Sequence, residues 1–340
     1  MYAPETGLSG GVGFYFIQHD TLQREIFPYP DEIEFYVNYS VRNQLQTKIE
    51  PVFYFRNGWR VNGRLDYYYF PDLFWGVGSN TAEKSETDYT LNSYSFSGAV
   101  DKSIYRIDGK DIFLGGGAKY NRMTSDLLSG DSDSLSQVLA DLPRTYGITG
   151  NETYELNINT IADLRDNILL PKEGMYHKGA IRYGYFTSAE GENGSYIGLD
   201  YDVRDYYDLG EGWLSKGRQM IAMQFVASQY FGRMPFNALP KIGSNIIMRG
   251  YYEGRYRDMS MYAFQTEYRF PLFWRFRGAA FASIGHVNEN LYKAIVDVPL
   301  WAVGIGGRFV WDRSTGLSAR LDIGLTEEGP GIYLNVKEAF

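Results

Sequence analysis

Residue types that carry out catalysis in soluble enzymes are few in this sequence and poorly spaced for it. The three histidines, His19, His177 and His286, stand in separate segments, and none belongs to an HExxH pair that could hold zinc. Gly7-Leu8-Ser9-Gly10 is one residue short of the GxSxG turn that exposes a nucleophilic serine, and no Walker-type phosphate loop is present. The sequence therefore predicts no catalytic residue, no cofactor and no metal.

Two chemical alternatives stay open. Asp131-Ser132-Asp133-Ser134 resembles the start of a calcium-binding loop, but the closing glutamate is missing, so a solvated loop is the simpler interpretation. A phospholipase with a Ser–His pair on a barrel wall is conceivable, although no close pair of this kind can be identified in the sequence.

Composition points to a barrel that crosses a membrane with strands. The chain has 340 residues with a mean hydropathy of −0.34, no cysteine, and 17% aromatic residues, of which 30 are tyrosine. Tyrosine and tryptophan suit the membrane–water interface, and a barrel hides its lipid signal because every second residue faces a polar lumen. No run of about 18 apolar residues exists, which excludes a transmembrane helix. The net charge of −8 without a basic tract argues against nucleic acid as a partner.

The dominant sequence period is two, which is typical of strands with two different faces. Between 316 and 325, aliphatic residues alternate with Ser318, Arg320, Asp322 and Gly324. Between 262 and 270, aromatic residues alternate with Gln265, Glu267 and Arg269 in the same way. We expect the polar face to line the lumen as a wall of mutually paired charges. The other members of this wall are Arg182, Asp200, Asp202, Arg204, Arg277 and Arg308.

The pattern predicts an all-β fold, a transmembrane antiparallel barrel that fills residues 1–340 as a single domain. The candidate strands are 8–18, 31–42, 45–56, 59–70, 89–103, 111–123, 152–163, 175–187, 195–208, 218–230, 258–270, 275–286, 299–310, 315–325 and 330–340. Bacterial single-chain barrels have even strand numbers, so 16 strands are expected, with 14 as the fallback and the counting error within 1–58. The long segments 125–148, 232–257 and 287–298 are predicted outer loops, and the first could hold a short helix over 128–140. Short turns such as 106–110 and 312–315 are predicted to face the periplasm.

Three segments resemble the BamA/TamA superfamily of outer-membrane assembly and secretion barrels. Met248-Arg249-Gly250-Tyr251 resembles the motif of the family's sixth outer loop, and it precedes a strand with the acidic Glu267 that closes in Arg269-Phe270-Pro271. The second is the turn Asp163-Leu164-Arg165-Asp166-Asn167. The chain closes with Tyr333 and Phe340 in a stretch that looks like the terminal β-signal read by the assembly machinery. The resemblance spans nearly the whole chain.

By that resemblance, loop six, with Arg249, Gly250 and Tyr251, folds back into the lumen, and Arg249 pairs with an acidic residue of the wall. The family's usual partner strand reads Phe-x-Asp-x-Gly, whereas this chain has Phe281-Ala282-Ser283-Ile284-Gly285, so Ser283 stands where the acid is expected. Because the period of two places Glu267 in the lumen, Glu267 is the preferred partner. A buried guanidinium needs such a carboxylate, although an ordinary loop arginine held by water is the alternative.

The resemblance implies a non-enzymatic barrel of a Gram-negative-type outer membrane that takes part in protein assembly, insertion or translocation. Its partners would be the lipid bilayer and lipopolysaccharide, with client proteins or assembly lipoproteins as further candidates. The alternative is a barrel-only membrane anchor or passive channel for an attached or partner domain. The chain opens Met1-Tyr2-Ala3-Pro4 without a recognisable signal peptide, so a leader and upstream POTRA domains are expected to have been removed, unless the protein is a barrel-only member.

Overall fold

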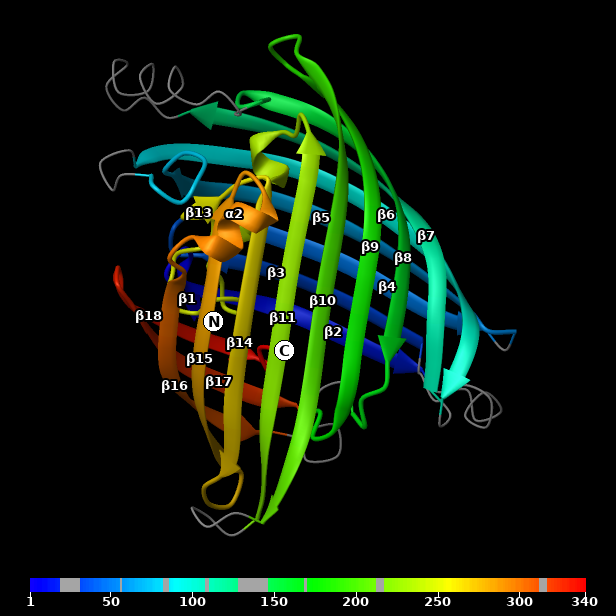
Figure 1. The fold of residues 1–340 in the computed structure, drawn as a ribbon, viewed down its shortest axis with the longest axis vertical. Helices are drawn as coiled ribbons and strands as arrows, with labels where there is room; N and C mark the ends of the chain where they lie inside the picture. Colours follow the sequence, from blue (N-terminus) through cyan, green and yellow to red (C-terminus); the bar gives the residue numbers. More distant parts are fainter. Residues whose placement is uncertain are drawn as a thin grey trace.

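The computed structural model describes residues 1–18, 31–55, 57–81, 86–107, 110–127, 146–167, 170–211, 217–311 and 317–340. Within these ranges the chain forms one closed barrel of sixteen antiparallel strands (Figure 1). The strands of the barrel are β1 (Tyr2–Ala3), β2 (Gly7–Gln18), β3 (Asp31–Ser40), β4 (Leu45–Phe55), β5 (Trp59–Phe74), β6 (Thr87–Ile107), β7 (Lys110–Leu127), β8 (Gly150–Asp163), β9 (Gly174–Ser188), β10 (Asn193–Glu211), β11 (Arg218–Gly232), β14 (Ser260–Pro271), β15 (Phe276–Asn288), β16 (Leu300–Val310), β17 (Ser318–Thr326) and β18 (Gly329–Val336).

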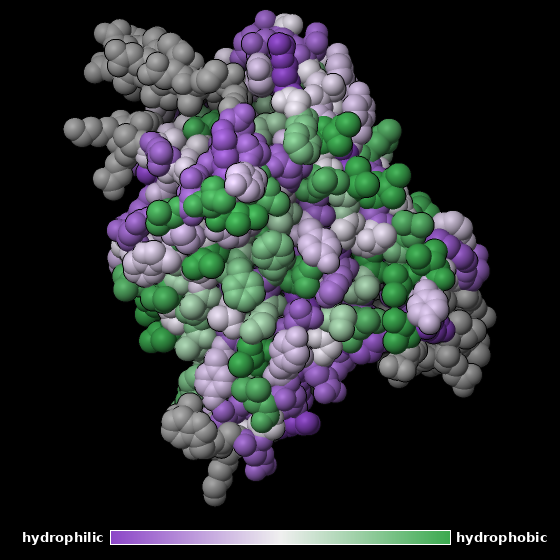
Figure 2. All heavy atoms as spheres, in the orientation of Figure 1, coloured by the Kyte–Doolittle hydropathy of each residue, from purple (hydrophilic) through white to green (hydrophobic). Residues whose placement is uncertain are grey.

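The burial of alternate residues is the reverse of that in a soluble protein. On β17 the aliphatic Leu321, Ile323 and Leu325 are exposed on the outer surface, whereas Arg320 and Asp322 are buried inside. Figure 2 shows hydrophobic side chains spread over the outer wall. A charged interior and an apolar exterior are stable together only when lipid covers the outside, so the membrane barrel expected from the period of two is confirmed.

Strand lengths vary widely around the barrel. β6 and β10 have 21 and 19 residues, whereas β17 and β18 have 9 and 8. The barrel closes between β18 and the two-residue β1. In the described part of the chain, Tyr2 with Leu334 is the single residue pair that joins these two strands. We call this junction of β18 with β1 and β2 the seam.

Loop six, residues 233–259, connects β11 to β14 and enters the lumen. It contains the 3-10 helix η2 (Phe236–Ala238) and the short strands β12 (Lys241–Ile242) and β13 (Tyr256–Arg257), which pair with each other. Loop six begins where β11 ends and finishes where β14 begins, and this end of the barrel is the predicted outer end. A second outer loop holds helix α2 (Leu291–Val296), and no helix in the described ranges has the length and apolar character needed to cross a membrane.

Two strand predictions differ from the structure in instructive ways. The missing sixteenth strand is β1, which lies within 1–58 as expected but is too short to show a period. The last strand was predicted to run to 340 and ends at Val336, because Lys337 adopts a φ of 71° and turns the chain inward. The predicted helix over 128–140, the acidic segment 131–134 and His19 lie outside the described residues.

Candidate functional site

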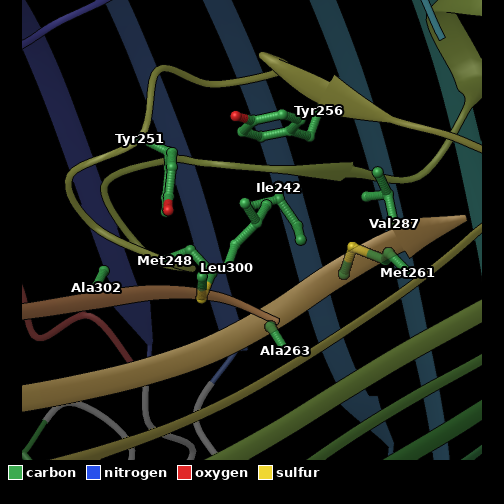
Figure 3. Packing of buried hydrophobic residues seen from close by; sticks show 9 residues of the cluster. All are labelled: Ile242, Met248, Tyr251, Tyr256, Met261, Ala263, Val287, Leu300 and Ala302. Atoms are coloured by element: carbon green, nitrogen blue, oxygen red, sulfur yellow. The ribbon is translucent and has the colours of Figure 1, made fainter. Parts of the chain in front are cut away.

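An apolar cluster fastens loop six to the inner wall of the barrel. Ile242, Met248 and Tyr251 from the loop are fully buried, and they pack with wall residues from three neighbouring strands (Figure 3). The wall residues are Met261 and Ala263 on β14, Val287 on β15, and Leu300 and Ala302 on β16. Since burying each large apolar side chain contributes about 1.5–3 kcal/mol, the loop is held as a plug and does not extend into the outer solvent.

Glycines on the adjoining strands β17 and β18 make room for the loop backbone. A Cβ placed on Gly324 of β17 would lie 2.2 Å from the carbonyl oxygen of Arg249, and one on Gly331 of β18 would lie 3.0 Å from Gly250. Gly250 itself has a φ of 128°, a conformation that residues with a side chain rarely adopt. The backbone of Arg249 and Gly250 thus lies directly against β17 and β18, because the wall residues at the contact are glycines.

Arg249 reaches two carboxylates at once. One terminal nitrogen of its guanidinium donates to Oε2 of Glu267 and the other to Oδ2 of Asp322, each over 2.5 Å. The guanidinium carbon lies 3.6 Å from the ring centroid of Phe281, and the Arg249 side chain is 1% exposed. The rigid fork of arginine suits two acceptors on different strands, which one lysine ammonium could not bridge in the same way.

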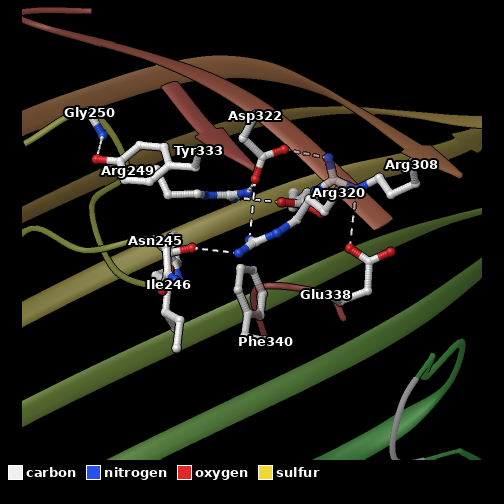
Figure 4. A network of polar contacts seen from close by, with 12 residues as sticks. Asn245, Ile246, Arg249, Gly250, Arg308, Arg320, Asp322, Tyr333, Glu338 and Phe340 are labelled. Carbon is white, nitrogen blue, oxygen red and sulfur yellow. Dashed lines mark hydrogen bonds and ion pairs between the residues drawn. The ribbon is translucent and has the colours of Figure 1, made fainter. Parts of the chain in front are cut away.

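The two carboxylates belong to a larger ionic cluster (Figure 4). Arg308 contacts Glu267 at 2.9 Å and Glu338 at 3.1 Å, and it also donates to Asp322. Arg269 donates to Glu267 at 2.7 Å, and Arg320 lies 3.2 Å from Asp322. The cluster therefore holds four guanidinium groups, of residues 249, 269, 308 and 320, around three carboxylates, of residues 267, 322 and 338. Such interlocking is required to offset the loss of hydration of buried charges.

The aromatic residues singled out near the C-terminus also meet this cluster. The hydroxyl of Tyr333 accepts from the backbone nitrogen of Gly250 at 2.9 Å and donates to the carbonyl of Tyr251 at 3.1 Å. Phe340 lies in the lumen against Tyr206 and Met220, and its carbonyl oxygen accepts from Arg269 at 2.9 Å. The loop motif and the C-terminal tail are thus joined through shared partners, and Phe340 faces the lumen and not the lipid.

Of the two partner candidates for Arg249, the structure brings Glu267 into contact and leaves Ser283 apart. The Ser283 hydroxyl donates weakly to the carbonyl of Ala302 at 3.4 Å. The second acid, Asp322, was grouped with the general wall charges, because alternation shows which face a residue occupies but not which loop it meets. Glu338 joins the cluster only because the chain turns inward at Lys337, and this turn has no sequence signal.

The rest of the lumen is polar and partly open. One cavity of about 610 Å³ is bordered by β4 to β9, and another of about 590 Å³ is bordered in part by loop six. The wall charges there are paired, as in Arg182 with Asp200 at 2.5 Å and Arg204 with Asp202 at 2.6 Å. In the part of the chain that is described, no group of three His, Asp or Glu residues could hold a metal ion.

One buried acid at the outer end predicts a pH dependence of stability. Glu5 lies in the turn between β1 and β2, and its Oε2 has no hydrogen-bond partner among the residues that the structure describes. Burial, followed by the carboxylates of Glu253 and Asp72, raises the pKa of Glu5 from 4.5 to about 7. The folded protein therefore binds this proton more tightly than the unfolded chain, so the contribution is complete below pH 4.5 and is lost as the pH rises through 7.

We expect Glu5→Gln to reduce the fall in unfolding free energy between pH 5 and pH 8 by up to about 3 kcal/mol. The measurement is urea unfolding in lipid vesicles at both pH values for the wild type and the variant. An unchanged pH dependence in the variant would mean that Glu5 is ionised in the folded barrel.

Comparison with known proteins places this arrangement in a family. Residues 30–335 match the model of the Omp85 superfamily domain, whereas no curated protein matches the chain. Two solved structures share the fold at 13% sequence identity: BamA from Haemophilus ducreyi lacking POTRA domains 1–3, with a TM-score of 0.57, and CdiB from Acinetobacter baumannii, with a TM-score of 0.62. Both alignments cover 99% of this chain, which spans 67% of the length of the first structure and 58% of the second. The chain belongs to the Omp85 superfamily and is an outer-membrane β-barrel of that family.

Proposed function

We propose that the protein takes part in the assembly and insertion of outer-membrane proteins, and that the seam is its working surface. The observation that carries this proposal is the contrast in pairing around the barrel. β18 pairs with β17 through eight residue pairs, whereas it pairs with β1 through one. Because each ladder contributes backbone hydrogen bonds along its length, the seam is the place where the wall opens most readily.

The edge of β2 supports the same proposal. Ser9 exchanges backbone hydrogen bonds with Met1, but no described strand covers the second edge of β2 from Gly10 to Gln18. Both faces of this stretch are exposed. An uncovered strand edge is a template for another strand, so an extended client segment could add to β2 by backbone pairing.

The short wall beside the seam would also favour insertion. Nine residues at about 3.4 Å each, tilted by about 45°, rise only about 22 Å, which is less than the apolar band of about 25 Å of an ordinary outer-membrane barrel. β17 and β18 have nine and eight residues. Lipid next to these strands must thin to match them, which lowers the barrier for a client to enter.

Protein translocation through the lumen is the second candidate within this family, and a passive channel or membrane anchor is the alternative outside it. Loop six occupies the lumen beside β14 to β16 and borders the cavity of about 590 Å³, so the barrel is expected to have low conductance while the loop stays there. We infer a non-enzymatic role, with lipid and lipopolysaccharide around the barrel and with client proteins or assembly lipoproteins as partners.

Locking the seam tests the proposal. The chain has no cysteine, so Tyr2→Cys with Leu334→Cys places one disulfide across the single pair that closes the barrel. Ile323→Cys with Ile332→Cys is the matched control, since this pair lies on the same exposed face but joins the well-paired β17 and β18. The measurement is the rate at which an unfolded outer-membrane protein inserts into vesicles that contain the barrel.

We expect the seam disulfide to reduce insertion to the rate of empty vesicles, and reduction with dithiothreitol to restore it. The control disulfide should leave the rate unchanged. If the locked barrel inserts clients as fast as the control, the seam is not the working surface, and translocation or anchoring becomes the better interpretation.

A further inference from the structure

Helix α2 lies on the outside of the barrel wall, although it belongs to an outer loop. Its Leu291 and Ala294 pack against Tyr262 and Ala227, which are on the lipid-facing sides of β14 and β11. Figure 1 shows α2 in orange over the outer surface near the predicted outer end. The 289–299 connection therefore folds back along the wall instead of rising into the solvent.

The polar groups of this connection are satisfied toward the protein. The backbone nitrogen of Leu291 donates to Oε1 of Gln229 at 2.6 Å, and the Asn290 side chain accepts from the backbone nitrogen of Lys293 at 2.9 Å. The Asn288 amide donates to Asp297 at 2.6 Å. The exposed charges of the connection are paired too, since Lys293 lies 3.5 Å from Glu289, and the other side chains on its outward side are mainly apolar.

Four apolar side chains of the connection are exposed. Val298 is 88% exposed, Tyr292 76%, Val296 60% and Ile295 57%. Isolated exposed apolar residues are ordinary on a surface, but four of them within seven positions form a patch that needs a cover.

The patch is continuous with the lipid belt of the barrel. The exposed side chains of Ile284, Trp301 and Val303 on β15 and β16 lie on the same outer face. Figure 2 shows hydrophobic surface over this part of the wall, with hydrophilic surface above it. Lipid already covers the belt, so the occupant that fits the patch without any further partner is the same lipid.

We propose that α2 is an interfacial helix whose outward face, Tyr292, Ile295, Val296 and Val298, inserts among the acyl chains of the outer leaflet. A short helix with one apolar face packed on protein and the other in lipid marks the upper boundary of the apolar belt. α2 covers Tyr262 near the start of β14 and Ala227 of β11, so it adds apolar surface at the outer edge of the belt on this flank. This proposal depends on the membrane barrel and not on the proposed role in assembly.

Fluorescence quenching tests the position of α2. Val296→Cys is compared with Glu192→Cys in the exposed turn between β9 and β10, each labelled with the environment-sensitive dye NBD. The barrels are reconstituted in phosphatidylcholine vesicles with or without lipids that carry a doxyl quencher near the headgroup, and folding is checked by heat-modifiability on gels. Aqueous iodide is the second quencher.

We expect the label at 296 to emit at shorter wavelength and to be quenched by the doxyl lipid about threefold more than the label at 192, with the reverse order for iodide. A label at 296 that iodide quenches as well as it quenches the control would place α2 in water and overturn the proposal. A label shielded from both quenchers would overturn it as well, because a protein contact would then cover the patch. Val298→Cys provides a second labelling position in case the first variant does not fold.

Discussion

Replacing Arg249 by alanine is expected to lower the free energy of unfolding of the barrel by about 3 kcal/mol. The variant leaves the buried Glu267 and Asp322 each without one of its charged partners, and it also removes the guanidinium from the ring of Phe281. The remaining arginines of the cluster still reach both acids, so the effect falls at the lower end of the range for a broken buried pair. Urea unfolding in vesicles, followed by heat-modifiability, measures it.

Arg218→Ala is the matched control for this variant. Arg218 also pairs with an acid, Asp208, at 2.6 Å, but its side chain is 67% exposed, so its loss should cost less than about 1 kcal/mol. Arg249→Lys should fall between the two, because a lysine can neutralise one carboxylate but cannot reproduce the fork. Equal stability of the Arg249 and Arg218 alanine variants would contradict the buried position of the loop-six arginine.

Replacing Gly324 by valine is expected to expel loop six without removing any charge. The new Cβ would lie 2.2 Å from the carbonyl oxygen of Arg249, a distance that no real contact allows. Since a barrel of this strand number leaves an aqueous channel when it is not plugged, the conductance in planar bilayers should rise by roughly tenfold.

Gly307→Val is the control for steric effects of the substitution itself. Gly307 lies on neighbouring β16, and a Cβ there would meet no atom of the described residues within 4 Å. Its conductance should equal that of the wild type. If Gly324→Val also conducts like the wild type, the loop either tolerates the added side chain or does not block the lumen.

Most of the fold could be predicted because the barrel imposes one simple rule on every strand. Lipid on one side and polar lumen on the other force alternation, and this rule located β2 to β11 and β14 to β18. Two-residue β1 is too short to show alternation, and the inward turn at Lys337 depends on a backbone angle. Helix α2 lay within the predicted loop 287–298, but its placement against Tyr262 depends on contacts between strands that are distant in sequence.

The candidate site could be predicted only in part, for a related reason. Arg249 could be identified from the loop-six motif that contains it, and Glu267 from the alternation of the strand that follows. Asp322 and Arg308 meet them only through the strand order of the closed barrel, 73 and 41 residues away from their partners along the chain. The space for the loop backbone comes from glycines such as Gly324, which read in sequence as ordinary strand positions.

Cysteine accessibility in intact cells tests most directly whether loop six is folded into the lumen of an outer-membrane barrel. Ile242→Cys places a thiol at a fully buried position of the loop, and Glu192→Cys places one in an exposed outer turn. We predict that a membrane-impermeant maleimide labels position 242 at least about 100-fold more slowly than position 192, and that unfolding in urea removes the difference. Equal labelling rates in the folded protein would show that loop six extends into the outer solvent, and the plugged barrel would then be wrong.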